Sequence, residues 1–293
     1  MPITDTPLRY PGGKSQLTPL VIDILRKNDL IYGEYVEPFA GGAGIAMTLL
    51  LNSYVSRVYL NDIDPTIFAF WHSVLHDTDE LCRRVQTIPM TMEEWRHQRA
   101  IFMDSTCEDI TARGFATLFL NRTNRSGILR GGVIGGYEQA GNYKMDCRFN
   151  RVDLVRKIKR IAMHKEQIEL SCLDAATFVK TVVPTTDACT LVNLDPPYYG
   201  KGPELYTNFY RHDDHEALAR AVDGIDRRWM VTYDDTPEIR QFYSAHPMYS
   251  SSLNYSAQEK RVGVELLISD ESLELPDYLT AYRLNPTEFD LAT

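Results

Sequence analysis

The sequence contains no apolar run of the roughly eighteen residues that a transmembrane helix requires, so no membrane partner is expected. Residues 1–5 lack the basic segment and apolar stretch of a secretory signal, which favours a cytoplasmic protein. The five cysteines are widely spaced and none forms a CxxC pair, so neither a zinc site nor a disulfide framework is predicted. We therefore expect no metal cofactor, and we expect reduced thiols.

Two common nucleotide-binding signatures are absent as well. The chain has no GxGxxG fingerprint, which argues against an NAD-dependent oxidoreductase. It also has no GxxxxGK[ST] motif, which argues against a P-loop nucleotide-binding protein.

Positive charge is scarce overall, because 31 Lys and Arg stand against 40 Asp and Glu and the net charge is −9. That balance alone argues against a nucleic-acid partner. The distribution is uneven, however. Residues 121–165 hold 11 basic and 3 acidic side chains, a net charge of +8, whereas residues 166–293 have a net charge of −12. A basic block in an acidic chain fits the phosphate backbone of a nucleic acid, and it fits a solvated helix face equally well.

Short apolar runs alternate with helical patterns in two separate parts of the chain. The first part predicts helices from Ser15, over 43–51 and from Pro65, with strands at 35–39 and 57–60. Strands return at 168–172, 190–194, 229–233 and 262–269. This alternation predicts an α/β protein with a doubly wound, mostly parallel sheet.

The region between these parts has a different pattern. Segments 93–103, 113–120 and 152–161 are helical in pattern, and a glycine-rich loop occupies 127–141. We therefore predict a doubly wound domain made of residues 1–75 and 166–293, with a mainly helical, basic domain of residues 76–165 inserted between its halves.

A glycine turn follows the first predicted strand, in the segment VEPFAGGAG at 36–44. Gly41 lets the backbone pass close to a bound ligand. The next strand ends in NDID at 61–64, where Asp62 can accept hydrogen bonds from ribose hydroxyls. The preceding Glu37 and Phe39 favour a mononucleoside-like ligand over a dinucleotide.

The segment RYPGGK at 9–14 precedes the first core helix. Tyr10 can stack on a ligand, Gly12 opens the backbone, and Lys14 can meet a carboxylate. An ordinary amino-terminal turn explains the same residues.

The segment NLDPPY at 193–198 follows an apolar strand. The two prolines remove two backbone donors and stiffen the chain, so the nearby carbonyls can accept hydrogen bonds from a ligand. An acid, a rigid carbonyl and an aromatic ring then project from the carboxyl end of a strand, where doubly wound sheets bind ligands. This set suits a planar amine: Asp195 and the Pro196 carbonyl accept its two N–H groups, and Tyr198 stacks on the ring.

Taken in order, these motifs resemble those of the Dam-type DNA adenine methyltransferases. The matching segments are RYPGGK at 9–14, VEPFAGGAG at 36–44, NDID at 61–64, FLNRTNRSGILR at 119–130 and DPPY at 195–198. YDDTPEI at 233–239 and EKRVGVELLIS at 259–269 are also similar to that family. The order of glycine motif, basic insert and DPPY is that of the alpha group of amino-methyltransferases.

The resemblance implies an S-adenosylmethionine-dependent methyltransferase fold whose basic insert is the DNA target-recognition domain. The implied reaction methylates the exocyclic amine of a flipped adenine in double-stranded DNA, with no metal. A monomer is expected, and a restriction endonuclease acting on the same DNA site is a candidate partner.

The resemblance also assigns roles to residues. The cofactor-binding residues would be Tyr10, Gly12, Lys14, Glu37, Phe39, Gly41, Asp62, Ile63, Asp174 and Asp195. The catalytic residues would be Asp195, Pro196, Pro197 and Tyr198. The DNA contacts would be Arg9, Arg122, Arg125, Ser126 and Arg130.

Two segments depart from the family. Arg125 and Ser126 stand where the best-known members have an aromatic-Asn pair, and the glycine-rich 131–136 replaces a longer basic hairpin. The recognition sequence GATC is therefore not carried over to this chain.

Other functions predict other residues. Methyltransferases acting on the amine of cytosine more often carry Ser in place of Asp195, and protein-glutamine methylases favour Asn there and need no basic insert. A non-catalytic DNA-binding protein of this fold would have no reason to keep Tyr10, Lys14 and Asp62 together with DPPY.

Overall fold

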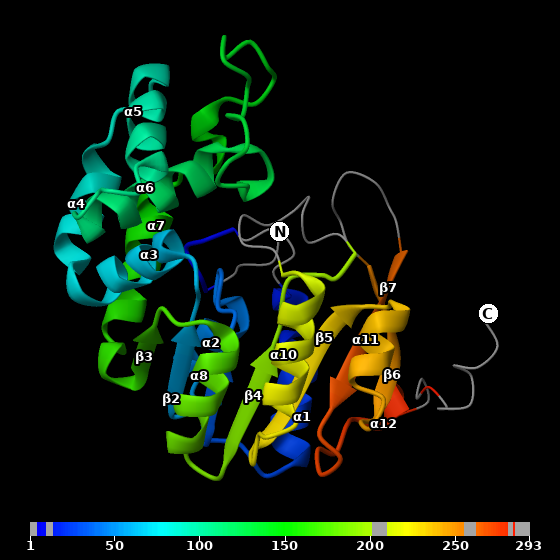
Figure 1. Ribbon diagram of the computed structural model, residues 1–293. Coiled ribbons are helices and arrows are strands. Elements are labelled where there is room, and N and C mark those ends of the chain that lie inside the picture. Colours follow the sequence, from blue (N-terminus) through cyan, green and yellow to red (C-terminus); the bar gives the residue numbers. More distant parts are fainter. Residues whose placement is uncertain (1–4, 10–13, 201–209, 255–261, 281–283, 285–293) are drawn as a thin grey trace. The chain divides into compact units, whose positions relative to one another are not determined.

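The computed structural model describes residues 5–9, 14–200, 210–254, 262–280 and 284, and seven strands within these ranges form one sheet (Figure 1). The strand order is β3-β2-β1-β4-β5-β7-β6. Their bounds are β1 Glu34–Glu37, β2 Arg57–Asn61, β3 Ile168–Ser171, β4 Thr190–Leu194, β5 Arg228–Asp234, β6 Met248–Asn254 and β7 Val262–Ser269.

The sheet is mostly parallel, as predicted. β1 pairs with β4 in parallel, and β4 pairs with β5 in parallel. Every residue of β4 is buried, which explains its almost continuous apolar sequence TLVNL. β7 runs antiparallel to both β5 and β6, and the strand β6 was not predicted from the sequence.

Most helices begin at a side chain that caps their free N–H groups. Asp64 accepts a hydrogen bond from the backbone N–H of Thr66 and is followed by Pro65, so α3 begins there. The principal helices are α1 Thr18–Lys27, α2 Gly44–Leu51, α3 Pro65–His76, α4 Thr78–Thr87, α5 Met92–Met103, α6 Ile110–Thr123, α7 Arg151–Ala162, α8 Ala175–Thr181, α10 His212–Val222, α11 Pro237–Phe242 and α12 Asp277–Thr280.

The predicted start of the first helix at Ser15 is wrong. A short 3-10 turn, η1 (Ser15–Leu17), comes first, and α1 begins at Thr18. The Ser15 carbonyl accepts a hydrogen bond from the Thr18 hydroxyl at 2.7 Å. The helical periodicity of the sequence is the same for both kinds of turn, so it could not separate them.

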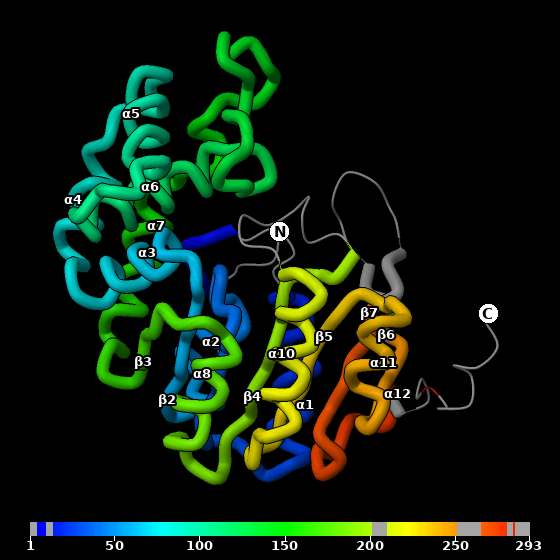
Figure 2. The backbone as a smooth tube through the Cα atoms, viewed as in Figure 1, coloured from blue at the N-terminus to red at the C-terminus, as the bar shows by residue number. Residues whose placement is uncertain are grey.

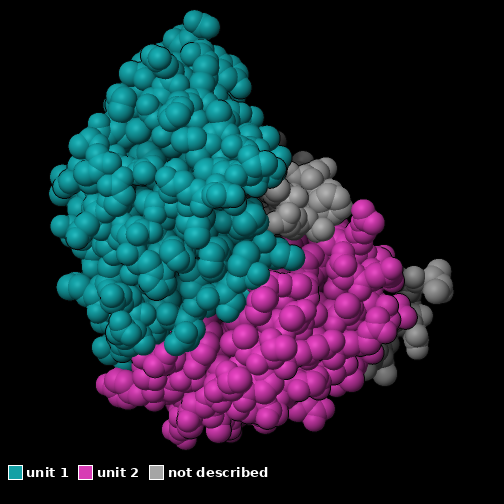
Figure 3. Space-filling view, turned by 60° about the vertical axis from the view of Figure 1, so that its left-hand side comes forward, with its two compact units in different colours: residues 1–18, 40–53, 60–172 teal, residues 19–39, 54–59, 173–293 magenta. Residues whose placement is uncertain are grey.

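The chain divides into two compact units, which Figure 3 colours separately. Unit 1 comprises residues 1–18, 40–53 and 60–172, and unit 2 comprises residues 19–39, 54–59 and 173–293. This division differs from the predicted catalytic and inserted domains, whose boundaries stay a prediction.

Unit 2 has an apolar core between its strands and three helices. The core joins residues of β1, β4, β5 and β7 to residues of α8, α10 and α11, and Phe178, Val192, Leu218 and Tyr233 are all fully buried. In the tube view of Figure 2, α8 and α10 run across one side of these strands. The carboxyl ends of β4 and β5 are therefore held in place by a closely packed core.

Unit 1 contains the helices α3 to α7. Its α6 is buried on nearly all sides, from Gly114 to Thr123. A helix with no exposed face lies at the centre of a bundle. The last turn of α6 therefore places its polar residues, NRTN at 121–124, inside the protein.

Candidate functional site

The glycine turn and the end of β2 meet within unit 1. Asp62 accepts two backbone hydrogen bonds, from the Gly41 N–H at 2.8 Å and from the Asp64 N–H at 2.9 Å. The Gly41 carbonyl in turn accepts a bond from the Trp71 indole at 3.0 Å. Gly41 has a φ of 44°, a conformation that glycine adopts without strain. Gly41 and Asp62, two of the predicted cofactor-binding residues, are thus brought together.

The Asp62 carboxyl group binds a proton more readily than an ordinary aspartate does. Burial raises its pKa to about 7, because desolvation opposes ionisation more strongly than the hydrogen bond from the Asp64 N–H favours it. The residue nevertheless keeps partial solvent exposure. A ligand whose hydroxyl groups donate hydrogen bonds to this carboxylate would favour its ionised form.

The other predicted cofactor residues of unit 1 are Ile63, which follows Asp62, and residues of the amino-terminal segment 9–14. Ile63 is 42% exposed, and its carbonyl accepts a weak bond from the Cys172 thiol at 3.9 Å. Lys14 is buried at the start of η1. Tyr10 and Gly12 lie outside the described residues.

In unit 2, the adjacent parallel strands β1 and β4 carry polar groups at their carboxyl ends. The Tyr35 hydroxyl donates to Glu37 at 3.2 Å and accepts from the Asn193 amide at 2.7 Å. Burial raises the pKa of Tyr35 well above its usual value, and the Glu37 and Asp195 carboxylates raise it further. Glu37 and Asp195 are thus close enough to act on one buried phenol.

The DPPY segment continues from β4 and is tied to β5. The Thr232 hydroxyl donates to Asp195 at 3.0 Å. Asp234 accepts from the Tyr199 N–H and the Gly200 N–H, each at 2.8 Å. Pro196 is buried, whereas Asp195 and Pro197 are partly exposed. The segment is therefore fixed at both ends and still reachable by a ligand.

Tyr198 is held at its hydroxyl end. The hydroxyl donates to Glu265 of β7, a residue that is 3% exposed. Tyr198 itself is partly exposed, so part of the side chain can meet a planar ligand. None of Thr232, Asp234 and Glu265 was predicted to belong to the site.

Two further predicted cofactor residues belong to unit 2. Phe39 makes an edge-to-face contact with Tyr210, with ring centroids 5.8 Å apart. Asp174 caps α8 by accepting a hydrogen bond from the Thr177 N–H at 3.0 Å. This cap gives Asp174 a structural role, and its predicted contact with a cofactor stays a prediction.

A loop after α6 in unit 1 is held by buried asparagines. Asn121 accepts from the Arg9 N–H at 2.7 Å and donates to the carbonyls of Arg9 and Gly127. Asn124 donates to the carbonyls of Ile128 and Leu129 and accepts from the Trp95 indole at 2.8 Å. Hydrogen bonds from two buried side chains therefore fix the backbone of the loop 125–130, although most of the loop's side chains lie at the surface.

The predicted DNA-contacting residues differ in exposure. Arg125, Ser126 and Arg130 are exposed on this loop. Arg122 is only 9% exposed and donates to the Pro7 carbonyl at 2.6 Å. Burial lowers its pKa to about 10, and the positive charges of Arg9 and Arg148 add to the effect. Arg122 is therefore held by a hydrogen bond to the backbone, close to two other positively charged side chains.

The basic block is not one solvated face. Lys157 is buried and pairs with Asp153 at 3.0 Å, and Arg160 pairs with Asp5 at 2.8 Å. Lys144 and Lys159 are exposed. Only part of the net positive charge of residues 121–165 is thus available to a polyanion.

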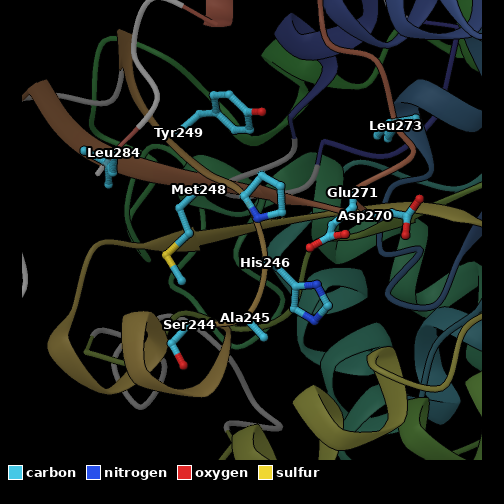
Figure 4. Close-up of a pocket in the computed structure, with 10 residues that line it drawn as sticks. Ser244, Ala245, His246, Met248, Tyr249, Asp270, Glu271, Leu273 and Leu284 are labelled. Carbon is cyan, nitrogen blue, oxygen red and sulfur yellow. The ribbon is translucent and has the colours of Figure 1, made fainter. Parts of the chain in front are cut away.

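A cavity of about 470 Å³ occurs elsewhere in unit 2 (Figure 4). It is lined by residues around His246, Met248, Asp270 and Leu273. The Asp270 N–H bonds to the carbonyl of Trp229, near the start of β5, whereas DPPY is tied to the end of that strand. Its lining includes neither the DPPY segment nor the residues that hold it.

A comparison with models of known protein families shows the family of this chain. Residues 10–259 match the model of the D12 class N6 adenine-specific DNA methyltransferases. The chain belongs to this family. The match spans the glycine turn, the basic segment and DPPY. Of the predicted motifs, it leaves out Arg9 of RYPGGK and all but the first residue of EKRVGVELLIS.

Known proteins of this kind are similar over most of the chain. The DNA adenine methylase of Salmonella typhi is 32% identical over 248 residues, which cover 80% of this chain and 83% of that protein. The Retron Ec67 DNA adenine methylase of Escherichia coli is 24% identical, covering 89% and 90%. The type II methyltransferase M.MjaIII of Methanocaldococcus jannaschii is 24% identical, covering 75% and 80%.

Membership of the family confirms the predicted reaction class, adenine-specific methylation of DNA. Methyltransferases generally take the methyl group from S-adenosylmethionine, and the α/β fold agrees with that chemistry. Over the described ranges, no cluster of three or more His, Cys, Asp or Glu side chains is arranged to hold a metal ion. In the same ranges, no helix combines the length and the apolar character needed to cross a bilayer.

Proposed function

We propose that this enzyme methylates the N6 amine of an adenine that is flipped out of double-stranded DNA at a specific sequence. The observation that carries the proposal is the DPPY segment, whose Asp195, Pro196 and Tyr198 stand at the carboxyl end of β4. Thr232 fixes the Asp195 carboxylate, and Glu265 fixes the Tyr198 hydroxyl.

The residues present fit S-adenosylmethionine. Asp62 has a partly exposed carboxylate, and hydrogen bonds from two backbone N–H groups fix its orientation. Gly41, with its positive φ, adds no side chain beside that carboxylate. Asp62 would accept hydrogen bonds from ribose hydroxyls, and Glu37, Phe39, Ile63 and Lys14 are proposed as further contacts. When bound, the cofactor supplies an electrophilic methyl group on its sulfonium.

Asp195 and the Pro196 carbonyl would accept the two N–H groups of the target amine. These bonds favour a more pyramidal nitrogen, whose lone pair is less delocalised into the ring. The Asp195 carboxylate also stabilises the positive charge that the nitrogen gains as its new bond forms. Because the amine is held in place, positioning supplies much of the rate enhancement.

Tyr198 would stack on the flipped adenine. Removing a base from the duplex costs a few kcal/mol, and stacking on an aromatic side chain recovers roughly 1–3 kcal/mol per base. The partial exposure of Tyr198 supports this role.

Unit 1 would supply the DNA contacts. Arg125, Ser126 and Arg130 are proposed to reach the duplex from the rigid loop 125–130, and an arginine can read guanine through two hydrogen bonds. Arg9 and Arg122 are proposed to contribute positive charge near phosphate. A monomeric enzyme and a cognate restriction endonuclease stay predictions, the latter supported by the name of the type II relative.

Expression in cells that lack adenine methylation tests the proposal. Sequencing of their DNA with detection of modified bases should find N6-methyladenine within one short sequence. Cells that express Asp195→Ala at the same level should show none. Methylation without sequence preference, or equal methylation by the variant, would contradict the proposed specificity or the proposed role of Asp195.

A further inference from the structure

Two carboxylates face each other across the strands β5 and β7. Asp234 and Glu265 are directly opposite residues of this antiparallel pair, so their side chains leave the same face of the sheet. Like charges in such positions destabilise a sheet, and a buried carboxylate adds a desolvation cost. This pair needs donors that compensate both groups.

Tyr198 of the DPPY motif and the two residues that follow it provide those donors. Asp234 accepts the N–H groups of Tyr199 and Gly200, and Glu265 accepts the hydroxyl of Tyr198. Two carboxylates on two strands therefore hold three consecutive residues of one segment.

Gly200 is matched to this contact. A Cβ at position 200 would lie 3.1 Å from Oδ2 of Asp234, closer than most such contacts in proteins. The backbone can approach the carboxylate because no side chain intervenes. This contact therefore depends both on the carboxylate of Asp234 in β5 and on the lack of a side chain at Gly200.

We propose that Glu265 is a positioning residue of the methylation reaction, which acts through the Tyr198 hydroxyl. This inference rests on the proposed stacking of Tyr198 on the flipped adenine. A carboxylate that accepts the phenolic hydrogen fixes the tilt of the ring. It also increases the electron density of the ring face, which strengthens stacking on a base whose amine gains positive charge. Asp234 fixes the backbone that carries the ring.

A double-mutant cycle separates this role from general structural support. Glu265→Gln keeps an acceptor and removes the charge, and Tyr198→Phe keeps the ring and removes the hydroxyl. Each single variant should lower kcat roughly tenfold, because one loses the charge of the acceptor and the other loses the donor of a charge-assisted hydrogen bond. The KM for S-adenosylmethionine should change little. The double variant should be no slower than the slower single variant.

Base capture provides a second readout. With 2-aminopurine in place of the adenine that the wild-type enzyme methylates, both single variants should show a smaller rise in fluorescence on binding DNA. Glu274→Gln, an exposed carboxylate on the same unit, is the matched control and should behave as wild type.

The opposing results are distinct. Multiplied losses of roughly a hundredfold in the double variant would mean that Glu265 does not act through Tyr198. Should Glu265→Gln fail to fold, Tyr198→Phe alone decides, because wild-type kcat and base capture in that variant would overturn the proposal. Either result would leave methylation of adenine by the wild-type enzyme intact, so failure of this inference is distinguishable from failure of the proposed function.

Discussion

Replacing Asp62 with Asn should remove most of the pH dependence of S-adenosylmethionine binding near neutral pH. The pKa of Asp62 is raised to about 7 in the free protein. Ribose hydroxyls that donate to the carboxylate favour its ionised form, so binding and ionisation are coupled. From about pH 6 to about pH 8, the apparent Kd of the wild-type protein should fall by about tenfold.

Stability of the free protein should change in the opposite direction. A carboxyl whose pKa is raised on folding contributes stability that is present below its unfolded value of 3.8 and lost as the pH rises through about 7. The free protein should therefore lose stability over the range in which the cofactor binds more tightly.

Calorimetric titration of wild type and Asp62→Asn at several pH values measures the coupling. The amino group of the cofactor also titrates near neutral pH, but it does so equally with both proteins. The difference between their profiles therefore isolates Asp62. Thermal unfolding checks the variant, since an amide provides one acceptor oxygen where Asp62 serves both Gly41 and Asp64. Parallel pH profiles for the two proteins would refute the coupling.

Three other experiments, with four substitutions, test separate parts of the molecule. Asp195→Ala should abolish methyl transfer and leave thermal unfolding close to that of wild type, and transfer at the wild-type rate would exclude the role of Asp195. On a library of randomised DNA, Arg130→Ala should relax sequence preference, whereas Lys159→Ala should at most lower affinity for all sequences alike. An unchanged preference in Arg130→Ala would exclude base reading. Gly127→Ala should destabilise the protein by roughly 1–3 kcal/mol in chemical denaturation, because φ is 79° and a Cβ would lie 2.2 Å from the Arg9 carbonyl. Wild-type stability in Gly127→Ala would show that the loop backbone can shift to accommodate the added Cβ.

The sequence could predict those candidate site residues that lie in short contiguous motifs. The glycine turn and Asp62 were predicted from spacing, and DPPY was predicted from its position after an apolar strand. Their structural counterparts are the bond from the Gly41 N–H to Asp62 and the anchored segment after β4.

Partners distant in sequence could not be predicted in this way. Asp195 and Thr232 are 37 residues apart, and Tyr198 and Glu265 are 67 apart, so their pairing depends on strand order. A signal was present, because Glu265 is a charged residue within the apolar strand VGVELLIS. A buried charge in such a strand indicates a partner without identifying it.

Charge counting could not separate exposed from buried basic residues, for a similar reason. Residues 121–165 have a net charge of +8, yet Lys157 is buried against Asp153 and Arg122 is buried against the Pro7 carbonyl. Burial decides which charges reach a ligand, and composition contains no information on burial. The exposed set is smaller, and it comprises Arg125, Arg130, Lys144, Arg156, Lys159 and Lys165.

The most direct test of adenine-N6 methylation identifies the product. The purified protein is incubated with unmethylated double-stranded DNA and S-adenosylmethionine labelled in its methyl group, and the DNA is then digested to nucleosides. We expect the label in N6-methyldeoxyadenosine, and none above background with Asp195→Ala. Label in N4-methyldeoxycytidine, or in no nucleoside at all, would contradict the assignment of this enzyme as an adenine methyltransferase.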